Sequence, residues 1–312
     1  MAPRLREGRF DALWVHGWGH WFHLWALRVA RRLGITVLMR GESGLHLRQP
    51  GGWRNTLKQR SLKYLTTHVD GYLAIGSLNR GFYESQGVPS SRIFPTPYAM
   101  DNAFFQARAA EASRHREVLR RELGLDPGRP VILYASKMTA RKCAGDLLEA
   151  YAGLSADGRA EPSPYLLFVG DGEQRLELEM RAAGFGWRSI RFLGFKNQTE
   201  LPRYYDLCDV FVLPSRQEPW GLVINEVMNT SRAVIASDEV GCGPDLVRHG
   251  ENGYVFPAGD TASLANVLRQ ALANPEWIAA MGRRSLALVN RWSFDEDIVG
   301  LEQALAAVQR GS

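Results

Sequence analysis

The 312-residue chain has little cysteine and no long apolar run, and both absences exclude classes of protein. Its three cysteines, Cys143, Cys208 and Cys242, form no CxxC pair and show no metal-ligand spacing, which argues against a disulfide scaffold and favours a reducing compartment. No stretch approaches the ~20 apolar residues that a membrane-spanning helix needs. The first nine residues carry arginines, but no compact apolar segment with a cleavage site follows them, so no secretory signal is expected. We therefore expect a cytoplasmic protein.

The charge is unevenly distributed along a chain of ordinary globular composition, with 45% hydrophobic and 23% charged residues. Residues 1–122 hold 19 Lys and Arg against 9 Asp and Glu, a balance of +10, and the remainder holds 19 against 24, a balance of −5. Two halves with net charges of opposite sign favour two domains with different partners. A basic first half suits phosphate groups or peripheral contact with an anionic membrane, and a solvated arginine-rich surface is the alternative. No nucleic-acid binding motif accompanies the charge, so nucleic acid is not expected as a partner.

Short β-rich runs alternate with amphipathic stretches throughout, which is the pattern of parallel βαβ units. Most of these runs are apolar along their whole length, as expected for strands buried on both faces of a sheet. We therefore expect an α/β protein with two Rossmann-like parallel-sheet domains. The predicted strands are Ala12–His16, Thr36–Arg40, Tyr72–Ile75 and Ile93–Pro95, followed by Val131–Ser136, Tyr165–Gly170, Ile190–Gly194, Val210–Pro214 and Ala233–Ser237.

The domain boundaries are expected in a charged stretch near the middle of the chain. An N-terminal domain is predicted over residues 1–110, a linker over 111–130 and a C-terminal domain over 131–290. Residues 291–312 are expected to form a helix that begins at a cap, Ser293, has three acids in its first turn and packs back toward the N-terminal domain. Open parallel sheets bind ligands at the carboxyl ends of their strands, so this organisation favours a binding site there.

The most informative segment runs from Ser215 to Glu226, with the sequence SRQEPWGLVINE. It follows a strand directly and opens a helix, and the N–H groups around Pro219 and Gly221 are free to hold a diphosphate. Glu226 lies on the apolar stripe of that helix, where a carboxylate needs a partner. That partner is either the vicinal diol of a ribose or an internal arginine or backbone amide, and spacing alone leaves both open.

This segment belongs to a series of motifs in a fixed order. The series comprises Ala135-Ser-Lys-Met-Thr-Ala-Arg-Lys142, Val169-Gly-Asp-Gly172, Phe192-Leu-Gly-Phe195, Tyr204-Tyr205, Cys208-Asp-Val-Phe-Val-Leu-Pro-Ser215, Val234-Ile-Ala-Ser-Asp238, Gly241-Cys-Gly243 and Asn252-Gly-Tyr254. It also includes two glutamates, Glu218 and Glu226, with seven residues between them. Each motif is weak alone. Together they make residues from about 131 to 255 resemble the donor-binding domain of a family 4, retaining glycosyltransferase of the GT-B fold.

The resemblance implies catalytic and binding roles for three side chains. Glu218 would face the donor sugar at its reacting end, and Glu226 would bind the ribose hydroxyls. His16 follows a predicted strand, at a position where retaining members of the family often place a histidine that faces the donor sugar. A histidine at a strand end is also a common structural residue, and both readings of His16 stay open.

The resemblance also implies how the diphosphate and base are held. Cations and helix N–H groups would stabilise the departing diphosphate, so no metal and no other cofactor is expected; the nucleotide sugar is a substrate. Lys137 stands where the family commonly has arginine, which keeps the charge but loses the bidentate fork. Lysines on a loop are also common as solvated surface. The residues in these roles are Lys137 and Lys142 for the diphosphate, the backbone of Gly221, Leu222 and Val223 for the sugar and diphosphate, and the backbone around Phe195 for the base.

The first half of the chain resembles the family more loosely. It contains fewer βα units than the N-terminal domain of the family, so we expect an incomplete acceptor-side domain. A reduced lineage, a truncated start, and an oligomer or partner chain that completes the domain all fit this expectation. The same half holds a tryptophan series, Trp14, Trp18, Trp21 and Trp25, beside several arginines. Core packing is the favoured interpretation of the series, and an interfacial surface is the alternative.

Taken with the resemblance, the sequence predicts a metal-independent, retaining glycosyltransferase of the hexosyltransferase type. It would move a sugar from a nucleotide-sugar donor to a glycan or lipid-linked hydroxyl acceptor, in polysaccharide, glycolipid or glycoconjugate biosynthesis. A donor-binding but inactive subunit that needs a partner chain, and a sugar-nucleotide epimerase of the same fold, are the alternatives.

Overall fold

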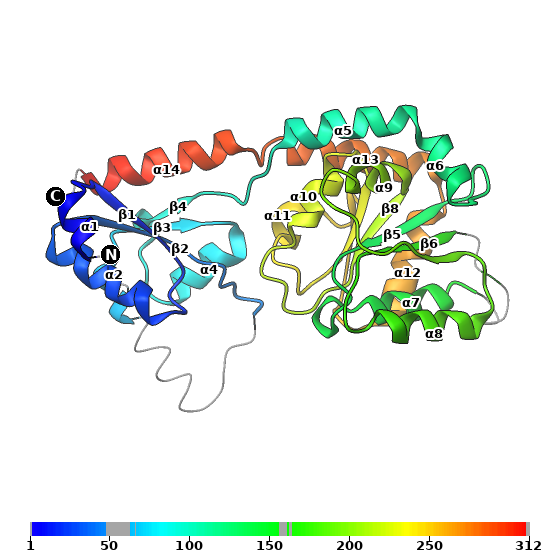
Figure 1. Ribbon diagram of the computed structural model, residues 1–312, viewed down its shortest axis with the longest axis horizontal. Helices are drawn as coiled ribbons and strands as arrows, with labels where there is room; N and C mark the ends of the chain where they lie inside the picture. The colour runs from blue at the N-terminus through cyan, green and yellow to red at the C-terminus, as the bar shows by residue number, and fades with distance from the viewer. Residues whose placement is uncertain (1, 48–62, 66, 156–160, 162–163, 310–312) are drawn as a thin grey trace. The chain divides into compact units, whose positions relative to one another are not determined.

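The computed structural model describes residues 2–47, 63–65, 67–155, 161 and 164–309, which form two compact units (Figure 1). The first unit comprises Met1–Ala99 and Trp292–Ser312, and the second comprises Met100–Arg291. Each unit is built on an all-parallel β-sheet covered by helices, which confirms the predicted α/β class with two Rossmann-like domains.

The sheet of the first unit has four strands in the order β1-β2-β3-β4. Helices α1, α2 and α4 cover one face, and α14 covers the other. The strands are β1 (Ala12–His16), β2 (Thr36–Arg40), β3 (Gly71–Ala74) and β4 (Ile93–Pro95), and the helices are α1 (Ala2–Glu7), α2 (Trp21–Arg32), α4 (Ser77–Ser85), the 3-10 turn η1 (Ser90–Arg92) and α14 (Phe294–Gln309).

Alternating side chains of the strands supply the two apolar layers of the first unit, because successive residues of a strand point to opposite faces. Val37 and Met39 pack in the same cluster as Leu27 of α2, whereas Leu38 packs with Ala304 of α14. Helix α14 lies so close to β4 that a Cβ at Gly300 would stand 1.7 Å from the carbonyl oxygen of Pro95. A helix from the end of the chain therefore completes the core of the first unit.

The start of α14 is a capping box. The hydroxyl oxygen of Ser293 accepts a hydrogen bond from the N–H of Asp295 at 3.1 Å, and the carboxylate of Glu296 accepts one from the N–H of Ser293 at 2.9 Å. The hydrogen bond from the Ser293 hydroxyl is the main reason why the pKa of Glu296 is lowered. The side chains that the sequence suggested as a cap thus fix where this helix begins.

The sheet of the second unit has six strands in the order β10-β9-β8-β5-β6-β7. Figure 1 shows α7, α8 and α12 on one side of this sheet and α9 and α10 on the other. The strands are β5 (Val131–Ala135), β6 (Tyr165–Val169), β7 (Ile190–Phe192), β8 (Val210–Leu213), β9 (Ala233–Ser237) and β10 (Gly253–Phe256); the helices are α5 (Asn102–Arg114), α6 (Arg116–Glu122), η2 (Ala140–Lys142), α7 (Ala144–Ala152), α8 (Arg175–Phe185), α9 (Leu201–Leu207), α10 (Leu222–Met228), α11 (Gly243–Leu246), α12 (Thr261–Leu272) and α13 (Pro275–Val289).

The expected linker over residues 111–130 is not a linker, because these residues are part of the second unit. Phe105 and Ala109 of α5 are buried, and α5 and α6 pack on α9. The guanidinium of Arg116 donates two hydrogen bonds to the carboxylate of Asp206, at 2.8 and 2.5 Å, and Arg232 donates a third at 2.9 Å. The charges that suggested a solvated connection belong in part to a partly buried ion-pair network around Asp206.

The tryptophan series divides into two pairs. Trp14 and Trp18 pack against the core of the first unit, and the ring of Trp18 stacks on Phe82 with centroids 5.9 Å apart. Trp21 and Trp25 of α2 instead remain 78% and 40% exposed. The core interpretation is therefore confirmed for the first pair and wrong for the second. None of the helices that the structure describes has the length and apolar character needed to cross a membrane.

Candidate functional site

The candidate site lies at the carboxyl edge of the six-stranded sheet, between β5 and β8. From β5 the chain adds β6 and then β7 outward in one direction, and it then returns to place β8 on the other side of β5. Neighbouring loops therefore leave the sheet in opposite directions at this point, which is where open parallel sheets bind their ligands. The loops after β5 and β8 are the two that carry the predicted Lys137, Lys142 and Glu218.

The loop after β5 is held against the loop after β6 by backbone hydrogen bonds. The N–H of Ser136 donates to Val169 at 3.1 Å, and the N–H of Met138 donates to Asp171 at 2.9 Å. Gly170 has φ of +127°, and a Cβ there would lie 2.0 Å from the carbonyl oxygen of Ser136. This close approach explains the Val-Gly-Asp-Gly motif. The exposed Lys137 is carried on a backbone that is fixed on both sides.

The loop after β8 is paired in the same way with the loop after β9. The N–H of Glu218 donates to the carbonyl of Glu239 at 3.0 Å, and the carbonyl of Glu218 accepts from Gly241 at 2.9 Å. A Cβ at Gly241 would stand 2.0 Å from the carbonyl oxygen of Pro219, so only glycine fits. The Gly-Cys-Gly motif therefore fixes the backbone that carries Glu218.

Glu218 meets two cations that come from the loop after β5. Its side chain is 9% exposed, and its Oε2 lies 2.5 Å from Nζ of Lys142 and 3.0 Å from a guanidinium nitrogen of Arg141. The carbonyl of Arg141 also accepts a hydrogen bond from the N–H of Arg216 at 2.8 Å, which ties the two loops together. The structure thus unites Glu218 with Lys142 and adds Arg141, which the sequence reading did not single out. Its place beside Lys142 in the same motif was the available signal.

The turn into α10 carries the backbone that was predicted to contact the sugar and diphosphate. Gly221 precedes the helix with φ of +98°, and a Cβ there would meet Val240 at 3.0 Å and Leu213 at 3.1 Å. Leu222 is 41% exposed and Val223 is partly buried. The first N–H groups of an α-helix have no partner within the helix, so those of Leu222 and Val223 are available to an anion.

Among the residues that the structure describes, Glu226 is held by a tyrosine and not by an arginine or a backbone amide. Its Oε2 accepts a hydrogen bond of 2.6 Å from the hydroxyl of Tyr205 on α9. Burial raises the pKa of the Glu226 carboxyl, and the hydrogen bond from Tyr205 partly opposes that rise. Burial also raises the pKa of the Tyr205 hydroxyl well above its ordinary value, so that hydroxyl stays a donor. Tyr205 appeared in the sequence only as part of a Tyr-Tyr motif.

The remaining predicted residues belong to other elements, one in each unit. Phe195 follows β7, two strands away from β5 in the sheet, and its side chain is 72% exposed. His16 ends β1 in the first unit, where its exposed ring stacks on Trp14 with centroids 5.1 Å apart. Across the described part of the chain, no three His, Cys, Asp or Glu side chains are grouped so that they could hold a metal ion.

One sequence family matches most of the second unit. The family described as glycosyl transferases group 1 matches residues 115–286, more than half of the chain. An alpha-D-kanosaminyltransferase of Streptomyces kanamyceticus is 31% identical over 202 residues, which cover 64% of this chain and 50% of that protein. A D-inositol 3-phosphate glycosyltransferase of Geodermatophilus obscurus is 34% identical over 176 residues, which cover 54% of this chain and 39% of that protein. The chain thus spans half or less of the length of these two relatives.

Solved structures share the fold at low sequence identity. HepE of Anabaena in complex with UDP has a TM-score of 0.77 and 17% identity, and the match covers 98% of this chain and 82% of that one. Sucrose-phosphate synthase of Thermosynechococcus elongatus has a TM-score of 0.77 and 23% identity, and the match covers 100% of this chain and 76% of that one. At such identities the likeness establishes the fold alone.

Proposed function

Because the chain belongs to the group 1 glycosyl transferases, we propose that it transfers a sugar from a nucleotide-sugar donor to a hydroxyl group of an acceptor. The observation that carries the proposal is the meeting of Glu218 with Lys142 and Arg141 at the switch point of the sheet. A cluster with two cations and one carboxylate has a net positive charge, and it lies beside the turn into α10. Such a place suits the departing diphosphate of a nucleotide sugar.

Lys142 can serve the acid and the diphosphate at the same time. An ammonium group has three N–H donors, and Glu218 takes one of them. The other two are then available for phosphate oxygens, together with Lys137 and the N–H groups of Leu222 and Val223. The ion pair seen here would keep Lys142 in position before the donor arrives, which is the preorganisation that transition-state stabilisation needs.

Glu226 is the proposed ligand of the donor ribose. Its carboxylate keeps Oε1 available after Tyr205 has bonded to Oε2, and an ionised carboxylate accepts up to four hydrogen bonds. The backbone around Phe195 would border the base. HepE was solved with UDP and UDP-glucose, so a uridine nucleotide is the first candidate for the donor.

We propose transfer with retention of the anomeric configuration and without a metal. The acceptor hydroxyl attacks the anomeric carbon on the face from which the diphosphate leaves, and the departing phosphate oxygen takes the hydroxyl proton. Glu218 orients the sugar and stabilises the positive charge that develops on it, and His16 is the proposed contribution of the first unit. The cations replace the metal ion as the charge that stabilises the leaving group. A lipid-linked or glycan acceptor, a hexose as the sugar, and assembly of cell-surface glycans or glycolipids complete the proposal.

A thermal-shift screen against uridine, guanosine and adenosine diphosphates tests the donor site. A ligand at about 100 times its Kd stabilises the native state by about 2.7 kcal/mol, which raises the melting temperature measurably. Folded protein whose melting temperature no nucleotide moves would remove the donor assignment. Nucleotide binding without transfer or hydrolysis, in the presence of a membrane extract and equally in Glu218→Ala protein, would instead favour a binding subunit without activity.

A further inference from the structure

A stripe of exposed tryptophan and arginine runs along α2 in the first unit. Trp21, Trp25, Arg28 and Arg32 are spaced four, three and four residues apart, so they share one face of the helix. The two tryptophans are 78% and 40% exposed, both arginines are exposed, and Phe22 beside them is 39% exposed. The opposite face of α2 is buried through Ala26, Leu27 and Ala30. The stripe is therefore the outer face of a helix that is fixed to the sheet.

The charge around the stripe is almost entirely positive. Helix α2 carries Arg28, Arg31 and Arg32 and no acid, and Asp70 pairs with Arg31 at 2.9 Å. Within the described part of the chain, neither Arg28 nor Arg32 forms an ion pair. A surface with this charge attracts phosphate-bearing surfaces, and exposed tryptophan is the residue that favours the boundary between lipid and water.

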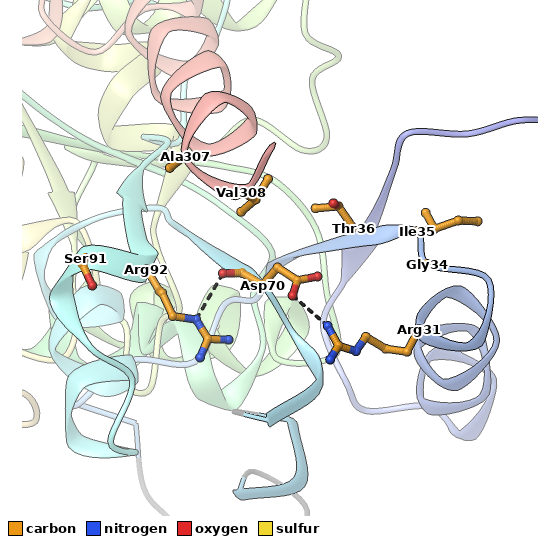
Figure 2. Close-up of a pocket in the computed structure, with 9 residues that line it drawn as sticks. All are labelled: Arg31, Gly34, Ile35, Thr36, Asp70, Ser91, Arg92, Ala307 and Val308. Atoms are coloured by element: carbon orange, nitrogen blue, oxygen red, sulfur yellow. Dashed lines mark hydrogen bonds and ion pairs between the residues drawn. The ribbon is translucent and has the colours of Figure 1, made fainter. Parts of the chain in front are cut away.

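Two cavities lie next to α2, and they differ in whether an acid lines them. Figure 2 shows the cavity of about 310 Å³ in which Arg31 donates to the carboxylate of Asp70 at 2.9 Å and Arg92 donates to the carbonyl of Asp70 at 3.1 Å. That cavity holds its own acid, and its guanidinium groups are already engaged. The second cavity, of about 320 Å³, is lined by Arg28, Arg31, Arg32, Tyr64 and His68 and has no acid among its described lining residues. It has the size and charge to take a phosphate head group.

We propose that this face of α2 binds the surface of a membrane that contains anionic phospholipids. Trp21, Phe22 and Trp25 insert at the boundary between head groups and acyl chains, and Arg28 and Arg32 bind lipid phosphates at the mouth of the acid-free cavity. The proposal does not depend on the transfer reaction, since the stripe belongs to the first unit and the donor site to the second. It would place the first unit where a lipid-linked acceptor is found.

Vesicle sedimentation with the full chain tests the proposal. Wild-type protein should bind phosphatidylcholine vesicles that contain phosphatidylglycerol and should not bind vesicles of phosphatidylcholine alone. Arg28→Gln with Arg32→Gln should weaken binding by about 25-fold, since each arginine near an anionic surface contributes about five-fold. Trp21→Ser with Trp25→Ser should weaken it by about ten-fold or more, because each ring would leave apolar surroundings. Higher salt should weaken the arginine contribution alone.

The second unit offers a matched control. Trp277 of α13 is 39% exposed and has the guanidinium of Arg284 at 4.8 Å from its ring, so it repeats the pairing of tryptophan and arginine in the other unit. Trp277→Ser should leave vesicle binding unchanged. All variants should keep the nucleotide-induced thermal shift of the wild type, which separates failure of this proposal from failure of the donor site.

Three results would overturn the proposal. The first is equal binding of wild-type protein to vesicles with and without phosphatidylglycerol, and the second is undiminished binding by the tryptophan variant. The third is a lipid-free wild-type dimer that the tryptophan variant converts to a monomer in analytical ultracentrifugation, because the stripe would then join two copies of the chain.

Discussion

Replacing Glu226 by alanine should weaken the binding of a nucleoside diphosphate by about ten- to 150-fold. In the structure only the hydroxyl of Tyr205 is bonded to the carboxylate, at Oε2, and no described residue donates to Oε1. We therefore expect one ribose hydroxyl to donate to Oε1. A hydrogen bond to a charged group is worth about 1.5–3 kcal/mol, and each 1.4 kcal/mol is a factor of ten in Kd. A second ribose contact would raise the loss further.

The pH dependence of binding gives this prediction a second test, with a definite sign. The ionised carboxylate is the form that accepts hydroxyl protons, and burial raises its pKa. As the pH falls, wild-type protein should therefore begin to lose nucleotide affinity at a higher pH than an ordinary glutamate would imply. Tyr205→Phe removes the hydrogen bond that lowers this pKa, so the loss should begin at a still higher pH. Glu226→Gln protein should bind the nucleotide weakly at every pH, and its affinity should not show this pH-dependent loss.

Isothermal titration calorimetry measures these affinities, and Glu218→Ala is the matched control. Glu218 forms ion pairs with Lys142 and Arg141, so its removal makes both cations available to the diphosphate. Glu218→Ala should therefore lower nucleotide affinity less than Glu226→Ala does. A thermal melt of each variant checks that it is folded. If Glu226→Ala protein does not fold, Glu226→Gln tests the same role. Wild-type affinity in folded Glu226→Gln protein, or a greater loss in Glu218→Ala than in Glu226→Ala, would refute the assigned roles.

Three further predictions concern the cations, the packing of α14 and the buried network. Lys142→Ala should lower kcat for sugar transfer by about 100- to 1000-fold, measured by steady-state kinetics, because a preorganised donor to the leaving group is lost. Gly300→Ala should destabilise the protein by about 1–3 kcal/mol in urea unfolding, since its Cβ would lie 1.7 Å from a carbonyl oxygen. Gly184→Ala, at a helical position with nothing within 4 Å of the added Cβ, should instead stabilise it by about 0.4–1 kcal/mol. Asp206→Ala leaves Arg116 and Arg232 without their shared partner and should cost about 3–5 kcal/mol in the same assay; a loss below 1 kcal/mol would contradict the importance of the network.

Strands that are buried on both sheet faces are the easiest to predict from the sequence. The run Val210–Leu213 is apolar at every position and Ala233–Ser237 at every position but the last, so their type and place follow from composition alone. Strand β10 was missed because it begins with Gly253 after an asparagine, a pair that indicates a turn. The glycine is needed for another reason: a Cβ there would lie 1.8 Å from the carbonyl oxygen of Val234. Close approach between neighbouring strands leaves no local signal that distinguishes it from a turn.

The unit boundary was misplaced because charge density does not distinguish a solvated helix from one that pairs its charges. The residues of α6 have the composition of a surface helix, yet Arg116 lies in a network with Asp206, which is 90 positions away in the chain. The packing of α5 and α6 on α9 depends on contacts between residues that are far apart in the chain. No periodicity within α5 or α6 reveals such contacts. Long-range contacts also separate Trp18 from Trp21, which is only three residues away. Trp18 packs against the core, whereas Trp21 is exposed, and the local sequence does not distinguish the two.

In the candidate site the family prediction is confirmed by the match over residues 115–286, and the residue roles stay predictions. The motifs placed Lys142 and Glu218 each after a predicted strand, but they did not predict that these strands would be neighbours or that the two side chains would touch. Their contact arises because Gly170 and Gly241 let two pairs of loops approach within backbone distance, which brings residues 76 positions apart to 2.5 Å. Any side chain at Gly241 would push Pro219 away and carry Glu218 with it. Gly241→Ala should therefore lower the activity even though the glycine itself offers no chemical group to the donor.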